Sequence, residues 1–350
     1  MGKDGATMAE PIRVAAVGLV HDHIWGTLDH LRADGRATLV AVCDDNAPLR
    51  DRAVREYGAL NAYTSLTDLL ERETIQAIVC GAENNRHPQV VEAAAARGVH
   101  VMVEKPMANS YEGARRMSDA ATRGGIMLMV NWPTAWSRSV NLTQTLIQEG
   151  RIGKPFYVKY HAGHNGPREI GCSEYFWGWL YDEAKNGPGA LMDYCCYGAN
   201  LACHFLGQPQ TVTGAGGKFV KDYDIPFDNA ILLLQYAGAV GVAEASWTQI
   251  GHPPAYELTV MGTEGSIVAG SGEDHVILVT PHSPSGQRLE GPPLPTGRHH
   301  EAAYFLTCIQ EGTPPAGMVS ARTALLAQEA LEAGARAIRE ERVVTLPLSS

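Results

Sequence analysis

The chain has 350 residues, of which 45% are hydrophobic and 19% are charged, and its formal net charge is −10. This size and composition are typical of a globular protein that is large enough for two separate cores. The acidic balance, without a dense cluster of Lys and Arg, excludes a nucleic-acid surface, and the lack of an apolar run of about 20 residues excludes a membrane span.

Strands and helices alternate along the first 131 residues. Apolar runs predict strands at 12–18, 38–45, 75–82, 99–104 and 126–131. Helical patterns predict helices at 24–33, 47–57, 66–73, 87–98 and 108–124. Because the strands are apolar throughout and do not alternate, we expect a doubly wound parallel sheet of α/β type, with helices on both faces, over residues 10–131.

The pattern changes after residue 132. The expected elements are a helix at 139–149, a strand at 155–163, a loop-rich aromatic section at 174–189 and a helix at 190–206. Alternating strands follow at 211–219, 229–237, 240–249, 256–265, 266–270 and 275–281, then a Pro/Gly-rich loop at 287–300, a helix at 320–339 and a strand at 342–348. We predict an α+β domain over 132–350, built on an open-faced, mostly antiparallel sheet, whose last helix can pack back on the first domain.

The first βα turn carries a weak dinucleotide signal. In the fingerprint G-x-G-x-x-G, Gly18 fills the first position, but Val20 and His23 fill the other two. The turn nevertheless follows an apolar strand and opens a helix, and Asp44 ends the next strand, where a carboxylate can accept ribose hydroxyls. Asp44 and Asp45 would repel a 2′-phosphate, which favours NAD over NADP. The alternative is a structural turn in a domain that binds another ligand.

A metal centre is a further alternative for this turn. His21 and His23 form a His-x-His pair of the kind that supplies two ligands in metal-dependent TIM-barrel hydrolases. The second half of the chain reads as antiparallel, however, and eight βα units cannot be counted. Cys195, Cys196 and Cys203 do not have the spacing of a zinc site either. We therefore expect no metal.

The run from Ile75 to Pro106 resembles the Gfo/Idh/MocA oxidoreductases, which are sugar and inositol dehydrogenases with a Rossmann domain and an open-faced sheet domain. The positions that match in order and spacing are Asn84, His87, Gly98, Glu104, Lys105 and Pro106. The resemblance covers nearly the whole chain, including 186–207. To the fingerprint positions Gly18, Val20 and His23 and the strand-end Asp44, the resemblance adds Asn84, His87, Glu104 and Lys105 as expected cofactor-binding residues.

The resemblance gives Lys105 a chemical role. Ligands of open α/β sheets bind beyond the carboxyl ends of the strands, and Lys105 follows such an end. Its ammonium can hydrogen-bond a sugar hydroxyl, and its charge favours the alkoxide that develops as hydride leaves. Pro106 holds the preceding residue extended.

The helix at 190–206 departs from the family pattern, in which Asp is followed by His after four residues and often by Asp after three more. Here Asp193 keeps the first position, Tyr197 replaces the His, and Asn200 replaces the last Asp and is expected to contact substrate. The resemblance implies Lys105, Asp193 and Tyr197 as catalytic residues. A phenol near an ammonium can have a lowered pKa and relay a proton. Alternatively, Tyr197 only binds substrate and another residue takes the proton.

Two histidines are the candidate replacements for the missing base. His161 and His164 stand at the end of a predicted strand, and the resemblance implies that this region lies near the cleft, so both are expected as substrate contacts. Trp177 and Trp179 suggest an aromatic platform for the C–H face of a sugar ring. His204 lies mid-helix among apolar residues and is expected to be a core histidine.

The expected function is NAD-dependent oxidation of a secondary hydroxyl of a sugar, polyol or glycoside. One alternative is a redox-neutral glycosidase or lyase that oxidises the sugar transiently to labilise a glycosidic bond. Another is a sensor that keeps the dinucleotide pocket without turnover. Seven cysteines, mostly in apolar segments, favour a reduced, cytoplasmic protein. The exposed face of the second sheet predicts a homodimer or homotetramer that assembles through this sheet.

Overall fold

The first sheet is parallel throughout and has the strand order β3-β2-β1-β4-β5-β6. The computed structural model describes residues 10–58, 60–251, 256–270 and 272–349. The strands of this sheet are β1 (Ile12–Leu19), β2 (Ala37–Cys43), β3 (Asn61–Tyr63), β4 (Ala77–Gly81), β5 (His100–Glu104) and β6 (Leu128–Asn131). Strand order reverses between β1 and β4, and at such a switch point open α/β sheets bind ligands.

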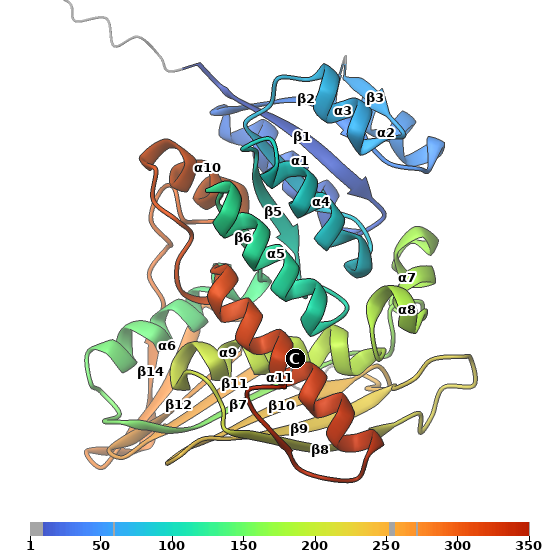
Figure 1. Cartoon of the computed structure of the whole chain (residues 1–350). Coiled ribbons are helices and arrows are strands. Elements are labelled where there is room, and N and C mark those ends of the chain that lie inside the picture. Colours follow the sequence, from blue (N-terminus) through green and yellow to red (C-terminus); the bar gives the residue numbers. More distant parts are fainter. Residues whose placement is uncertain (1–9, 59, 252–255, 271, 350) are drawn as a thin grey trace, which may run out of the picture.

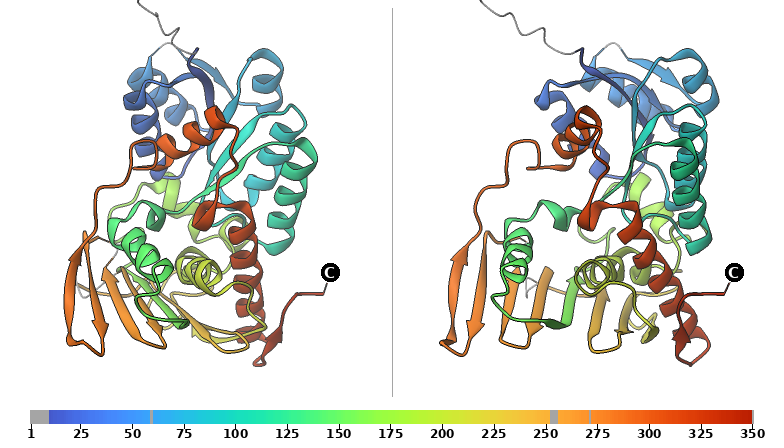
Figure 2. Two further views of the ribbon diagram at one scale, coloured as in Figure 1. Left: turned by 90° about the vertical axis from the view of Figure 1, so that its left-hand side faces the viewer. Right: turned by 60° about the vertical axis from the view of Figure 1, so that its left-hand side comes forward.

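Helices cover both faces of this sheet (Figure 1). They are α1 (His23–Asp34), α2 (Ala47–Tyr57), α3 (Leu66–Arg72), α4 (His87–Ala95) and α5 (Tyr111–Gly124). Figure 2 shows α1 on one face and α4 with α5 on the other. The doubly wound Rossmann fold predicted for this part of the chain is confirmed.

The second sheet is mixed and has the strand order β14-β13-β12-β11-β7-β10-β9-β8-β15. Its strands are β7 (Pro155–Gly163), β8 (Thr211–Gly217), β9 (Asn229–Gln235), β10 (Val240–Ser246), β11 (Tyr256–Gly262), β12 (Gly265–Gly270), β13 (His275–Thr280), β14 (Ser283–Glu290) and β15 (Val344–Thr345). All neighbours are antiparallel except β7 and β10, which are parallel. The mostly antiparallel sheet of the prediction is therefore confirmed.

The remaining helices are α6 (Arg138–Gln148), α7 (Glu174–Leu180), α8 (Glu183–Asn186), α9 (Ala190–Leu206), α10 (Glu301–Glu311) and α11 (Ala321–Arg339). Figure 2 shows α6, α9 and α11 on one face of the second sheet, whereas no described helix covers the other. The uncovered face exposes Ile231, Leu233 and Met261, of which 47%, 42% and 39% are accessible. It is the open face of the sheet.

Two helices near the end of the chain contact the Rossmann half. Helix α10 packs against α1, and α11 packs against α5 as well as against α9. The Arg36 guanidinium contributes by donating to the Ala303 carbonyl, at 3.0 Å, and to Thr307 Oγ1, at 2.9 Å. The last helix thus lies between the two sheets (Figure 1). Within the described residues, none of the helices combines the length and hydropathy that a membrane span requires.

The structure corrects four details of the sequence prediction. The aromatic section at 174–189 contains helices α7 and α8, so it is not loop alone. The segment assigned to a Pro/Gly-rich loop at 287–300 begins inside β14, and the short strand β3 and the helix α10 were not predicted.

Helix α7 begins after Ser173, whose hydroxyl caps it by accepting the Phe176 N–H.

Candidate active site

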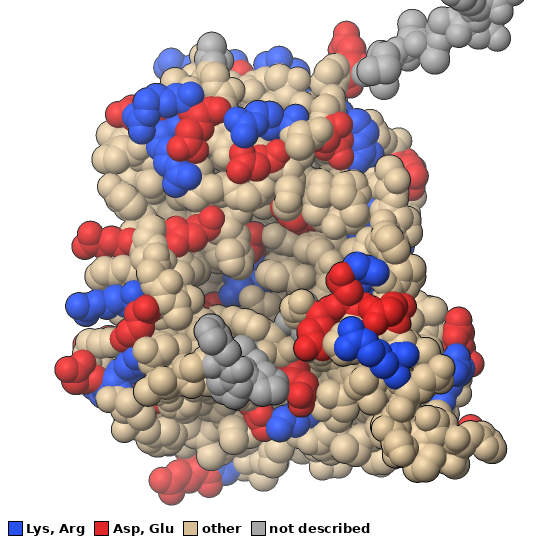
Figure 3. Space-filling model, turned by 180° about the vertical axis from the view of Figure 1, so that it is seen from behind, with Lys and Arg blue, Asp and Glu red and all other residues tan. Residues whose placement is uncertain are grey.

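A cavity of about 310 Å³ lies where the end of β5 faces helix α9. The residues that line it are His23, Lys105, Pro133, Thr134, Tyr160, His164, Pro167, Ile170, Cys172, Phe176, Asp193, Tyr194, Tyr197 and Tyr256. Seen from behind, the molecule is hollowed between its two halves, and most of the surface of this hollow carries no charged side chain (Figure 3). Both halves of the chain therefore contribute to the cavity.

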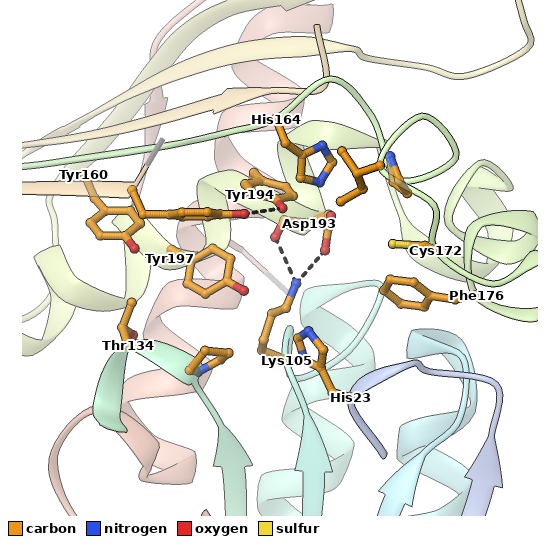
Figure 4. Close-up of a pocket in the computed structure, with 14 residues that line it drawn as sticks. His23, Lys105, Thr134, Tyr160, His164, Cys172, Phe176, Asp193, Tyr194 and Tyr197 are labelled. Atoms are coloured by element: carbon orange, nitrogen blue, oxygen red, sulfur yellow. Dashed lines mark hydrogen bonds and ion pairs between the residues drawn. The ribbon is translucent and has the colours of Figure 1, made fainter. Parts of the chain in front are cut away.

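Lys105 and Asp193 form an ion pair at the centre of the cavity (Figure 4). Lys105 Nζ lies 2.5 Å from Asp193 Oδ1 and 3.3 Å from the Asp193 carbonyl oxygen, and both side chains are buried. Burial disfavours the ammonium, but the charge of Asp193 outweighs this effect and holds the pKa of Lys105 well above its usual value. The lysine is therefore a fixed positive charge at neutral pH.

Four tyrosines surround this pair. They are Tyr160 from β7, Tyr194 and Tyr197 from α9, and Tyr256 from β11. Lys105 Nζ lies 4.9 Å from the centre of the Tyr197 ring, and the Tyr194 and Tyr256 hydroxyls are hydrogen-bonded at 2.8 Å. Burial raises the pKa of Tyr197 well above its usual value, although Lys105 opposes this shift. The expectation of a lowered pKa at Tyr197 is therefore wrong: the phenol stays protonated at neutral pH.

His164 also faces the cavity, where its ring packs edge-on against Tyr194. Burial lowers the pKa of His164 to about 4 against the opposing charge of Asp193, so the imidazole is neutral. His164 Nδ1 accepts the Gly166 N–H at 2.8 Å. Because a neutral imidazole carries one proton, that proton sits on Nε2. His164 can donate a hydrogen bond to a ligand but offers it no free lone pair.

A second cavity, of about 300 Å³, lies at the carboxyl ends of β1, β2 and β4. Gly18, Asp44, Asp45 and Arg86 are among the residues that line it. Gly18 has a φ of 74°, and a Cβ there would lie 2.4 Å from the Ala82 backbone, so only glycine fits. Asp44 Oδ2 accepts the Leu19 N–H at 2.6 Å, which fixes the carboxylate at the edge of the sheet.

The other predicted cofactor residues have different surroundings. Val20 is buried in the hydrophobic core. His87 is buried with Nδ1 3.1 Å from the Met107 carbonyl and Nε2 3.2 Å from the Ala82 carbonyl, so it braces loops and does not line either cavity. Asn84 donates from Nδ2 to Asn186 Oδ1 at 2.9 Å, but among the described residues its buried Oδ1 has no partner.

Several predicted substrate contacts lie away from the cavity. His161 projects from the open face of the second sheet, where Nδ1 lies 3.0 Å from Glu244 Oε2. Trp177 is half-buried outside the cavity lining, and Trp179 is buried against the His21 ring. Asn200 is buried and donates to the Met318 carbonyl at 3.2 Å. The structure does not bring these predicted substrate contacts to the cavity. The predicted residues that it does bring together there are His23, Lys105, His164, Asp193 and Tyr197.

His204 is half-buried, with Nε2 3.3 Å from Gln144 Oε1. Burial lowers the pKa of this imidazole. His204 is thus a packed residue with a polar partner, as expected for a structural histidine.

Two groups of His and carboxylate side chains have ligand atoms within 4.8 Å of one another in the described chain: His21, His23 and Glu104, and His30, His300 and Glu301. One imidazole of each group is engaged by the backbone. His21 Nδ1 accepts the His23 N–H at 3.2 Å, and His300 Nδ1 accepts the Ala303 N–H at 3.0 Å. In the neutral form these imidazoles carry their proton on Nε2. Neither group presents three free lone pairs, and we assign no metal to them.

Sequence reasoning missed most of the cavity lining. Thr134 follows strand β6 at the same sheet edge as Lys105, so the rule that located Lys105 could also have located it. Its buried Oγ1 has no hydrogen-bond partner among the described residues. Tyr194 directly follows Asp193, whereas Tyr160 and Tyr256 come from strands that meet α9 only in the folded protein. No local sequence signal marks those two.

Two family descriptions match the chain. Residues 12–132 match the oxidoreductase family with an NAD-binding Rossmann fold, and residues 140–268 match the Gfo/Idh/MocA C-terminal domain. Among solved structures, a levoglucosan dehydrogenase in complex with NADH and levoglucosan superimposes with a TM-score of 0.83 at 20% identity, covering 97% of this chain and 100% of that one. At this identity the structural likeness shows the fold alone.

Curated relatives carry several names. The scyllo-inositol 2-dehydrogenase (NAD(+)) of Bacillus subtilis is 27% identical over 326 residues, which are 88% of this chain and 89% of that protein. An uncharacterized oxidoreductase of Streptococcus pneumoniae is 32% identical over 70% of this chain and 68% of its own length. The 2,7-anhydro-N-acetylneuraminate hydratase of Mediterraneibacter gnavus is 29% identical over 66% of this chain and 60% of its own length. The chain belongs to the Gfo/Idh/MocA family of oxidoreductases.

Proposed function

We propose that this protein oxidises a secondary hydroxyl of a carbohydrate, polyol or glycoside with NAD as the hydride acceptor. The observation that carries the proposal is the buried Lys105–Asp193 pair. It lies at the carboxyl edge of a Rossmann sheet and inside a cavity of about 310 Å³, a volume that suits one sugar ring with a substituent. The dehydrogenase names of the relatives agree with this reaction.

The residues at the sheet edge fit NAD. Asp44 is held at the end of β2, where a carboxylate can accept ribose hydroxyls, and the unpartnered Asn84 Oδ1 offers a buried acceptor. Asp45 lies in the same cavity, and its charge disfavours a 2′-phosphate, so we propose NAD in preference to NADP. Val20 replaces a fingerprint glycine, but its side chain is buried in the core and away from the groove. When bound, NAD accepts the hydride from the substrate carbon.

Lys105 and Asp193 would act together on the substrate. The Lys105 ammonium donates a hydrogen bond to the reacting hydroxyl and stabilises the negative charge that develops on its oxygen. Asp193 keeps Lys105 protonated and holds its Nζ in place at 2.5 Å. Tyr197 lies with its ring against the ammonium, and His164 presents Nε2–H as a donor to a further ligand hydroxyl.

A substrate screen with NAD tests this function. Sugars, inositols and glycosides are incubated with the protein, and both NADH absorbance and released aglycone are followed. A dehydrogenase accumulates NADH in proportion to substrate, and Lys105→Ala loses nearly all turnover while keeping the fold by circular dichroism. A Lys105→Ala variant that turns over like the wild type contradicts the proposal.

A second candidate is a redox-neutral reaction in which the sugar is oxidised and then reduced again. The relative named as a hydratase favours it, because hydration is not a net oxidation. In that case an aryl glycoside releases its aglycone without lasting NADH absorbance. The same screen therefore separates the two reactions.

We also propose an oligomeric state and a cellular location for the protein. The open face of the second sheet carries exposed Ile231, Leu233 and Met261, and such a face is normally covered by another subunit. A homodimer or homotetramer formed through this sheet would cover it. The seven thiols, all of them free, favour a reducing compartment such as the cytoplasm.

A further inference from the structure

Oxidation of a hydroxyl requires a group that takes its proton, and neither the polar residues that helix α9 presents to the cavity nor His164, directly after β7, offers one. Burial raises the pKa of both Tyr194 and Tyr197, so both phenols are already protonated, and His164 carries its proton on Nε2. Asp193 is a carboxylate, but it is paired with Lys105 in a buried site. Protonation of Asp193 would leave the ammonium buried without its counter-charge, which is strongly unfavourable. The acceptor must therefore come from another wall.

His23 offers the missing lone pair. Its Nδ1 lies 3.2 Å from Glu104 Oε2. Because an ionised carboxylate only accepts hydrogen bonds, Nδ1 carries the proton of the neutral imidazole and Nε2 is left free. This is the arrangement in which a base is oriented by a carboxylate behind it.

The carboxylate of this pair is itself fixed in place. Glu104 is buried, and its Oε1 accepts a hydrogen bond from Asn131 Nδ2 at 2.6 Å. Asn131 Oδ1 in turn accepts from Trp136 Nε1 at 2.9 Å. The chain of contacts determines which way Glu104 points and therefore which nitrogen of His23 is protonated.

His23 also has the position that a base needs. It lines the cavity. Figure 4 shows the His23 ring beside the Lys105 side chain, whose ammonium points toward Asp193. The His23 side chain is 43% exposed, so a proton that it accepts can pass to solvent. His21 is no rival, because it is buried and its Nδ1 accepts a backbone N–H.

We propose that His23, oriented by Glu104, is the general base of the reaction; this inference rests on the proposed function. The O–H bond of the substrate breaks and its proton goes to His23 Nε2. The oxygen electron pair forms the carbonyl as the hydride leaves the carbon for the nicotinamide. Glu104 balances the charge of the resulting imidazolium, which then releases its proton to water. The imidazole that the family places on the helix at position 197 is thus supplied here from the opposite wall, by a residue in a fingerprint glycine position.

Chemical rescue tests this role. We expect His23→Ala to lower kcat by about 100-fold to 10,000-fold, the range for loss of a general base, with NADH affinity changed by less than about threefold. Added imidazole should restore kcat of His23→Ala by at least about tenfold, because it can fill the space and take the proton. His23→Gln should show no rescue, since its side chain fills that space.

His30→Ala is a matched control. His30 lies on the same helix, and its Nδ1 also contacts a carboxylate, Glu301, at 2.8 Å, but it does not line the cavity. His30→Ala should keep the kcat and the NADH affinity of the wild type, and added imidazole should not change its kcat. The inference is overturned if His23→Ala keeps its kcat, if imidazole fails to rescue it, or if the main loss is in NADH binding. Failure of the proposed function is a separate outcome: the wild type itself then turns over no carbohydrate.

Discussion

The centre of the buried Tyr197 ring lies 4.9 Å from Lys105 Nζ. The contribution of this ring to catalysis can be separated from that of the Tyr197 hydroxyl by mutation. Phenylalanine keeps the ring and its cation–π contact. We therefore expect Tyr197→Phe to lower kcat by less than about tenfold, whereas loss of a general base costs about 100-fold or more. Steady-state rates with NAD and the best carbohydrate of the screen measure this. A loss of kcat of about 100-fold or more in Tyr197→Phe would instead identify Tyr197 as the proton acceptor.

Asp193 controls the charge of its neighbour, which gives a prediction for pH. The raised pKa keeps Lys105 protonated at neutral pH and well into the alkaline range, so the wild type should show no loss of kcat from lysine deprotonation up to about pH 10. In Asp193→Asn the strongest influence that raises the pKa of the ammonium is gone, so burial lowers this pKa relative to the wild type. Activity of this variant should fall at lower pH than in the wild type.

The pH dependence of kcat for both proteins checks this expectation. Lys105→Arg is the matched control, because a guanidinium remains charged over the whole range and should show no alkaline decline of this kind. An Asp193→Asn profile that runs parallel to the wild type would contradict the assigned coupling.

Single residues also show what the sequence could predict. Lys105 and Asp193 were located because the family resemblance matches both positions, and the structure shows them after a strand and in the first turn of a helix. His161 was misplaced because successive strand residues point to opposite faces. Its neighbour Tyr160 faces α9 and lines the cavity, so His161 must face the open side. Which face of β7 meets α9 depends on tertiary packing, which the sequence of the strand does not reveal.

Helix α7 connects the first βα turn to the cavity. Asp22 accepts two hydrogen bonds from Ser173, at 2.8 Å from the backbone N–H and 2.5 Å from Oγ. The same Ser173 Oγ caps α7, and Phe176 of this helix lines the cavity. Asp22→Ala should therefore loosen α7, with a cost of about 1–3 kcal/mol for the unpaired donors and a raised KM for the carbohydrate.

Thermal unfolding and KM measure the two effects. Glu174→Ala removes an exposed carboxylate from the first turn of the same helix, so it should lower stability by less than about 1 kcal/mol and leave KM near the wild type. If Asp22→Ala behaves like Glu174→Ala, the contact does not position the helix.

Short elements were the ones that sequence patterns failed to define. Helices α7 and α8 have 7 and 4 residues, which is too short for a helical period to emerge, and they depend on their Ser173 and Asp182 caps. Strand β3 has 3 residues and forms only by pairing with β2. Long apolar strands and long amphipathic helices such as α11 were predicted because their patterns extend over several turns or residues.

At the scale of the whole molecule, the open sheet face predicts assembly. Leu233 is 42% exposed in the single chain, so a charge there costs the folded subunit little but would be buried in a subunit interface. We expect Leu233→Glu to convert the oligomer into a monomer at micromolar concentration, as measured by light scattering. Tyr175→Glu is the matched control, because Tyr175 is 40% exposed but lies on helix α7 and not on this sheet. A wild-type protein that is already monomeric would contradict the proposed assembly.

The distribution of charge over the molecule bears on its substrates. The net charge of −10 repels anions at long range, and within the cavity Lys105 and Asp193 cancel each other. The described residues that line the cavity include no arginine, no second lysine and no second carboxylate. Hence an acidic sugar would enter without a counter-charge, and burial of an unpaired charge is costly.

We therefore expect a neutral glycoside to have a kcat/KM at least about 100-fold above that of the matching uronide, which corresponds to about 2.7 kcal/mol. Paired aryl glucosides and glucuronides measure this ratio, and salt separates its two causes. Screening at high ionic strength removes the long-range repulsion but hardly affects a buried group. A preference that persists at high salt locates the selectivity in the cavity. A ratio that falls to one at high salt would attribute the preference to the net charge of the surface alone. Equal rates at low salt would contradict both the long-range repulsion and the selectivity of the cavity.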